Sequence, residues 1–169
     1  VGRRACYDGV GVEDAGIDVY AGAIKVDEHY QTSVPHVYAV GDVVGNPMLA
    51  HKADADGMAA AAHILDVDIK KPTVVPSPIF TMPEVAGVGM AEEELRTRGV
   101  KFKSARVRFG SNGKAVCDGE ENGLAVFYGE EGSGRLLGAH FIGSEASLLA
   151  AEAALAIQNS LTAMDVVTT

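Results

Sequence analysis

The sequence is poor in cysteine and in basic residues. Its two cysteines, Cys6 and Cys117, belong to no Cys-x2-Cys or Cys-x4-Cys pair. Both are therefore expected to be reduced thiols, and disulfide exchange is not expected within this chain. Fourteen Lys and Arg residues stand against 23 Asp and Glu, a net charge of −9. The basic residues are scattered, which excludes nucleic acid and anionic membrane surfaces as expected partners.

Long apolar runs and targeting signals are also missing. The longest apolar stretch, near the carboxyl end, is interrupted by Glu145 and Glu152. Its uninterrupted apolar runs are far shorter than the roughly 20 apolar residues that a membrane span requires. The opening residues show no charged segment followed by an apolar one, so no signal peptide is expected. These features predict a cytoplasmic location, or the mitochondrial matrix in a eukaryote.

Sequence motifs for several kinds of chemistry are absent. Ser77, Ser111 and Ser144 lie in turn-like contexts outside any G-x-S-x-G motif, and no Walker-type phosphate loop is present. The five histidines have no cysteine, histidine or carboxylate neighbours at a metal-ligand spacing. We expect neither a metal site nor a nucleophile and base pair.

The composition is that of a globular chain, with 47% apolar and 22% charged residues. Proline punctuates residues 66–78, at Pro72, Pro76 and Pro78. Proline removes backbone donors and favours extended neighbours, which is typical of a connector. We therefore predict two domains, residues 1–70 and residues 71–169.

The first part reads as a strand, a loop and a long helix. Residues 34–40 (VPHVYAV) are rich in β-branched and aromatic side chains and predict a buried parallel strand that ends at Gly41 and Asp42. Residues 48–65 predict a helix, with Asn46 as N-cap and Pro47 at its first position.

The second part reads as an α+β domain. Residues 79–90, 102–109, 124–128 and 136–142 predict strands, with turns at 111–113 and 131–134. Residues 91–98 and 145–159 predict helices. Short links between successive strands favour an antiparallel sheet with helices laid on it.

The sharpest candidate site lies where the first strand is expected to end. A glycine there allows close approach of a ligand, and the Asp42 carboxylate can accept hydrogen bonds from sugar or ribityl hydroxyls. The helix that follows offers the unpaired N–H groups of its first turn and the positive end of its dipole to an anionic group. An ordinary strand-ending turn and an ordinary surface helix remain the alternatives.

Two motifs resemble those of a known family. Residues 32–42 (TSVPHVYAVGD) resemble the second flavin-binding motif of the pyridine nucleotide-disulfide oxidoreductases, and residues 47–53 (PMLAHKA) are similar to the flavin-facing helix start of dihydrolipoamide dehydrogenases. Residues 1–4 (VGRR) resemble the end of the family's NAD-binding domain. Residues 79–89 (IFTMPEVAGVG) resemble the opening of its dimerisation domain.

The resemblance implies a fold, cofactors and site residues. The fold would combine the carboxyl-terminal part of a Rossmann-like FAD-binding domain with an α+β dimerisation domain. The enzyme would pass electrons from dihydrolipoamide to NAD through an enzyme disulfide and FAD. It would act as a homodimer that serves the lipoyl domain of a 2-oxo acid dehydrogenase or glycine-cleavage complex. The implied contacts are with NAD at Gly2 and with FAD at Gly41, Asp42, Met48, Leu49, Ala50 and His51.

The sequence also departs from the family pattern. The redox Cys pair, the Gly-rich FAD loop and the His-Pro motif with its supporting Glu do not occur in these residues. The resemblance therefore implies that the chain by itself binds FAD weakly or not at all and does not turn over. Leu148 stands where the family has Glu. Mercuric reductase, soluble transhydrogenase and a non-catalytic dimerisation module are the alternatives.

Overall fold

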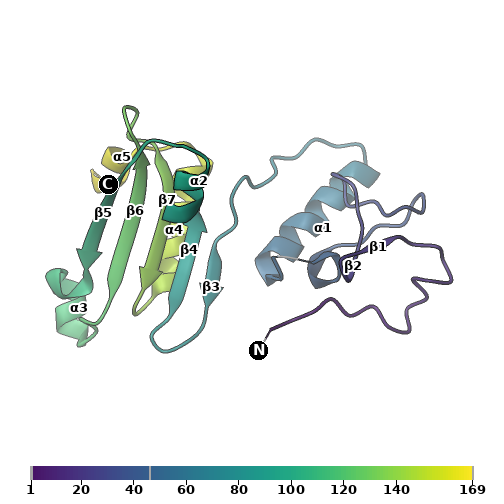
Figure 1. The fold of residues 1–169 in the computed structure, drawn as a ribbon, viewed down its shortest axis with the longest axis horizontal. Coiled ribbons are helices and arrows are strands. Elements are labelled where there is room, and N and C mark those ends of the chain that lie inside the picture. Colours follow the sequence, from purple (N-terminus) through teal and green to yellow (C-terminus); the bar gives the residue numbers. More distant parts are fainter. Residues whose placement is uncertain (1, 46, 169) are drawn as a thin grey trace. The chain divides into compact units, whose positions relative to one another are not determined.

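The computed structural model describes residues 2–45 and 47–168. The chain divides into two compact units, Val1–Pro72 and Thr73–Thr169 (Figure 1). None of the helices in the described part of the chain is long and apolar enough to cross a membrane.

The first unit holds little regular sheet. Strands β1 (Val19–Tyr20) and β2 (Ala23–Ile24) form a short antiparallel pair, and a 3-10 turn η1 (Gly41–Val44) precedes helix α1 (Ala50–Ile64). The strand predicted at residues 34–40 is wrong. That segment forms turns and one antiparallel bridge, between Gln31 and Tyr38. A parallel strand needs parallel neighbours, whereas the described residues of this unit pair residues 30–32 with residues 37–39 in an antiparallel hairpin.

Helix α1 begins later than predicted. It starts at Ala50 rather than at residue 48, and Leu49 is extended with φ −134° and ψ 131°. The Leu49 N–H donates to the Pro47 carbonyl at 3.1 Å, which closes a tight turn and keeps Pro47 outside the helix. The predicted cap, Asn46, lies outside the described residues.

The second unit is a five-stranded antiparallel sheet in the order β3-β4-β7-β6-β5 (Figure 1). Its strands are β3 (Ser77–Ile79), β4 (Val85–Gly89), β5 (Phe102–Arg108), β6 (Leu124–Glu130) and β7 (Leu136–Ile142). The predicted strand at 136–142 is confirmed. The strand predicted at 102–109 ends one residue earlier, at Arg108, and that at 124–128 continues to Glu130.

One predicted strand proves to be a hairpin. Residues 79–90 were expected as a single strand, but β3 and β4 pair with each other and residues 80–84 form the loop between them. Pro83 has no N–H for a sheet ladder, and the Thr81 hydroxyl donates to the Pro83 carbonyl at 2.8 Å. The connector also ends earlier than expected, because Ser77 already belongs to β3, an edge strand that tolerates Pro78.

The turn predicted at 111–113 is wrong as well. A 3-10 turn η2 (Phe109–Ser111) leads into helix α3 (Gly113–Asp118). The Asn112 side chain caps this helix by accepting the N–H groups of Lys114 at 2.9 Å and Ala115 at 3.2 Å. Asparagine favours both turns and helix N-caps, so its presence in the sequence did not separate the two.

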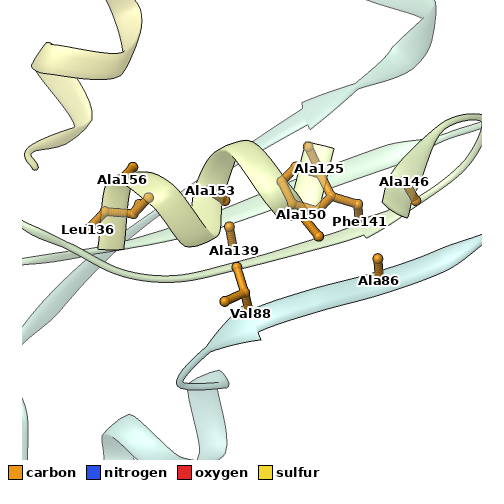
Figure 2. Close-up of a cluster of buried hydrophobic side chains, with 10 residues drawn as sticks. All are labelled: Ala86, Val88, Ala125, Leu136, Ala139, Phe141, Ala146, Ala150, Ala153 and Ala156. Atoms are coloured by element: carbon orange, nitrogen blue, oxygen red, sulfur yellow. The ribbon is translucent and has the colours of Figure 1, made fainter. Parts of the chain in front are cut away.

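Helix α4 (Ala146–Gln158) covers one face of the sheet and forms the larger core (Figure 2). Its buried face is made of small side chains, Ala146, Ala150, Ala153 and Ala156. Their spacing of three and four residues places them on one side of the helix, so the helix axis can lie close to β4 and β7. Phe141 fills the space between α4 and the sheet.

A smaller core lies on the other face, under helix α2 (Glu92–Thr97). Leu95 of that helix is fully buried against Tyr128 and Leu137. The last helix, α5 (Ala163–Val167), was not predicted and is held by a capping box between Thr162 and Asp165. Two layers of helix on an antiparallel sheet confirm the predicted α+β class for this unit.

Candidate functional site

The Gly41 and Asp42 turn sits directly against helix α1. Gly41 has φ +79°, a left-handed conformation that glycine adopts without strain. A Cβ atom on Gly41 would lie 3.3 Å from the Cβ of Ala53 on α1. The following residue, Asp42, is the second residue of the 3-10 turn and is exposed. Glycine therefore brings the turn close to the helix, and Asp42 presents its carboxylate to solvent.

The start of α1 lies beside this turn and carries the other predicted contacts. Met48 is buried, Leu49 is partly buried, and Ala50 and His51 are exposed in the first turn. The first N–H groups of an α-helix have no intrahelical acceptor and lie at the positive end of its dipole. An exposed carboxylate and a helix N-terminus are thus close together in one unit. The pair can accept hydrogen bonds from hydroxyls and donate them to an anion.

A tight hairpin at residues 27–39 leads into the turn. The Asp27 carboxylate accepts the N–H groups of His29 at 2.8 Å and Gln31 at 2.9 Å, and these backbone hydrogen bonds hold the pKa of Asp27 below its usual value. The Ala39 N–H donates to the Tyr30 carbonyl at 3.0 Å. Tyr30 itself has φ +65°, which is uncommon for a bulky residue and persists only where its surroundings fix it.

A polar network joins this hairpin to α1. The Tyr30 hydroxyl donates to Oδ1 of Asp56 at 2.5 Å, and the Lys52 ammonium donates to Oδ2 of the same carboxylate. Asp56 is only 3% exposed, so its charge depends on these two partners. The Lys52 ammonium also lies 5.6 Å from the centre of the Tyr30 ring.

The network predicts a loss of stability in alkaline solution. Burial, followed by the hydrogen bond to Asp56 and the charge of that carboxylate, raises the pKa of Tyr30 to about 12. The unfolded chain loses this phenolic proton near pH 10 while the folded chain keeps it. Stability is therefore full below about pH 10 and falls as the pH rises toward about 12. With a discount for partial exposure, the loss is about 1–2 kcal/mol.

Urea unfolding from about pH 9 to about pH 12 measures this effect. Tyr30→Phe removes the titrating group, and its stability should fall less steeply over this range. Asp56 and Lys52 face the phenol and are present in both proteins. Parallel pH profiles for the wild-type chain and Tyr30→Phe would contradict this assignment.

The structure brings most of the predicted site residues into one region. The Gly41 and Asp42 turn and residues 48–51 lie at the start of α1, whereas Gly2 is exposed in coil at the beginning of the unit. Sequence reasoning missed Tyr30 and Asp56. The spacing of Lys52 and Asp56, four residues apart on a helix, was an available signal because such pairs share one face.

Other chemistry is limited in the described residues. Cys6 and Cys117 are exposed and form no disulfide. No group of three or more His, Cys, Asp or Glu side chains among residues 2–45 and 47–168 is arranged to hold a metal ion. His29 and His63 stack on each other with ring centres 4.1 Å apart, and a ring nitrogen of His140 lies 3.3 Å from the Met90 carbonyl oxygen.

Sequence comparisons point to one family across both units. Residues 75–169 match the family described as pyridine nucleotide-disulphide oxidoreductase, dimerisation domain. Residues 1–57 match the family described as pyridine nucleotide-disulphide oxidoreductase. Mitochondrial dihydrolipoyl dehydrogenases of mouse and human are each 38% identical over 98% of this chain. The chain spans about a third of the length of these relatives, 33% in both.

Solved structures agree with the fold. LpdA from Mycobacterium tuberculosis superposes with a TM-score of 0.89 at 26% identity, covering 100% of this chain and 38% of that protein. The HOCl-induced flavoprotein disulfide reductase RclA from Escherichia coli gives a TM-score of 0.87 at 22% identity, covering 95% of this chain and 38% of RclA. At that identity RclA supports the fold alone. The matched dimerisation domain extends over more than half of the sequence, and the chain belongs to the pyridine nucleotide-disulphide oxidoreductase family.

Proposed function

We propose that this chain supplies flavin contacts and the dimerisation domain of an FAD-dependent dihydrolipoamide:NAD oxidoreductase. Residues 1–70 would form the end of the NAD-binding domain and the carboxyl-terminal segment of the FAD-binding domain. Residues 71–169 would form the dimerisation domain of a homodimer. The observation that carries the proposal is the exposed Asp42 carboxylate beside the N-terminus of α1.

The donors and acceptors at this place fit FAD. Asp42 is an acceptor for the hydroxyls of the ribityl chain, and the N–H groups at the start of α1 suit the edge of the flavin ring that becomes negative on reduction. Gly41 is consistent with this, since its left-handed backbone and a Cβ position only 3.3 Å from the Cβ of Ala53 disfavour a larger residue in the turn. Bound FAD would relay electrons between a dithiol and NAD.

The remaining assignments follow from the same proposal. Gly2 is the residue assigned to NAD. The redox disulfide and the His and Glu acid/base are assigned to positions other than these 169 residues. The lipoyl domain of a 2-oxo acid dehydrogenase or glycine-cleavage complex is the proposed protein partner. The cytoplasm or the mitochondrial matrix is the proposed location, and the mouse and human relatives are named as mitochondrial.

An affinity measurement tests the flavin assignment. FAD is titrated into the chain, and binding is followed by the change in flavin fluorescence. Asp42→Ala removes the proposed acceptor of ribityl hydroxyls and should raise the Kd about 10–100-fold, because hydrogen bonds to a charged group are worth about 1.5–3 kcal/mol. Asp14→Ala is the matched control, since Asp14 is an exposed aspartate of the same unit.

The proposal expects weak binding that depends on Asp42 and not on Asp14. Equal Kd values for the wild-type chain and Asp42→Ala would contradict the placement of the ribityl chain. A tight, stoichiometric complex would contradict it too, because the contacts assigned to these residues are only part of those that FAD requires.

A further inference from the structure

Tyr30 is attached to both halves of the candidate flavin site. Its carbonyl accepts the Ala39 N–H at 3.0 Å, two residues before Gly41. Its hydroxyl donates to Asp56 at 2.5 Å, on the second turn of α1. The Tyr30 backbone therefore holds the segment that leads into the Gly41 and Asp42 turn. Its side chain holds helix α1, whose first turn is assigned to the same flavin.

Asp56 completes the connection from the helix side. It receives a hydrogen bond from Tyr30 and an ion pair from Lys52, one turn earlier on α1. Lys52 immediately follows the residues assigned to the flavin, and its side chain is 21% exposed against 5% for Asp56. The other ion pairs along helices in the described residues, such as Lys114 with Asp118, lie at the surface.

We propose that Tyr30, Asp56 and Lys52 form a positioning network. This network holds the Gly41 and Asp42 turn and the first turn of α1 at the relative position in which both can contact one flavin. This role rests on the proposed function. The three side chains act through the backbone that they fix and are not themselves assigned to contact the flavin.

The arrangement suits positioning better than general stability. A carboxylate that is 3% exposed carries a desolvation cost, and an apolar side chain would avoid it. Tyr30 also adopts φ +65°, a conformation that costs free energy in a tyrosine. Both features occur where Tyr30 of the hairpin contacts the helix. The field of a helix end decays within one turn, so a small displacement of the turn from α1 would weaken the two flavin contacts together.

A double-mutant cycle on FAD affinity tests the network. The variants are Tyr30→Phe, Asp56→Asn and their combination, and the Kd for FAD is measured well below the thermal transition of each protein. Tyr30→Phe keeps the ring and loses only the hydroxyl, so it should fold, and its Kd should rise about tenfold. The double variant should bind no more weakly than the weaker single variant, because both substitutions break one connection.

The matched control is Tyr20→Phe, which removes a hydroxyl from a tyrosine of the same unit that is 77% exposed. Its Kd should equal that of the wild-type chain. The thermal midpoint is recorded for every variant, since a purely structural role would lower the midpoint and leave the Kd of the folded protein unchanged.

The outcomes separate this inference from the proposed function. A wild-type chain that binds FAD through Asp42 while Tyr30→Phe and Asp56→Asn keep the wild-type Kd overturns the positioning network alone. Multiplicative effects of the two substitutions on the Kd also overturn it. If Asp42→Ala leaves the Kd unchanged, the proposed function fails, and the network loses its role with it.

Discussion

Replacing Gly138 with alanine is expected to lower the free energy of unfolding of the second unit by about 3 kcal/mol. Gly138 lies in β7 opposite Gly89 of β4. A Cβ atom there would lie 2.1 Å from the Met90 carbonyl oxygen and 3.0 Å from its carbonyl carbon. These are backbone atoms, so the collision cannot be relieved by rotating a side chain. The two strands must therefore separate locally. This separation also weakens the hydrogen bond from the Met90 N–H to the Leu137 carbonyl, which is 3.0 Å long.

Urea unfolding followed by circular dichroism measures this change in the 169-residue chain. Gly113→Ala is the control, because Gly113 opens helix α3 and a Cβ atom there would have no neighbour within 4 Å. Its stability should stay within about 0.5 kcal/mol of the wild-type value. A Gly138→Ala protein as stable as Gly113→Ala would show that β4 and β7 are not paired in the register described.

Truncating Phe141 to alanine should cost about 3–5 kcal/mol of unfolding free energy. Phe141 is 4% exposed and lies between the sheet and α4 (Figure 2). Its ring meets that of Phe127 edge to face, with ring centres 5.5 Å apart. The alanines of α4 that surround it have no longer side chain with which to fill the space. The cavity therefore persists, and its cost adds to the lost transfer free energy.

The same urea experiment measures this loss, with Phe80→Ala as the matched control. Phe80 is 78% exposed, so its truncation should change stability by less than about 0.5 kcal/mol. Phe141→Leu should recover most of the loss, because it restores much of the volume. Equal effects of the substitutions at Phe141 and Phe80 would contradict the described packing of α4 on the sheet.

Elements defined by local pattern were predicted well. Strand β7 was expected at residues 136–142 and is found at Leu136–Ile142, and the helix expected at 145–159 is found at Ala146–Gln158. Each is a predominantly apolar segment bounded by glycine or polar turns, so its limits depend on neighbours in the sequence. Both pack within their own unit, which supplies the partners that the pattern requires.

Elements that depend on distant partners were predicted poorly. Residues 34–40 have the composition of a buried strand, but a strand exists only where another strand pairs with it. The start of α1 was misplaced because Met48 is buried and Leu49 is extended, neither of which the Asn-Pro pattern reveals. The contact between Tyr30 and Asp56 joins residues 26 positions apart, beyond any periodicity. The turn at Gly41 and Asp42, in contrast, was predicted from adjacent residues, and it is found in the 3-10 turn η1.

The most direct test of the flavin assignment is a residue-resolved map of FAD binding on the 15N-labelled chain by nuclear magnetic resonance. We predict that FAD shifts the backbone amide signals of residues 41–42 and 48–52 and leaves those of the sheet β3-β4-β7-β6-β5 unchanged. Shifts confined to the second unit would contradict the assignment of Asp42 and the start of α1 to the flavin.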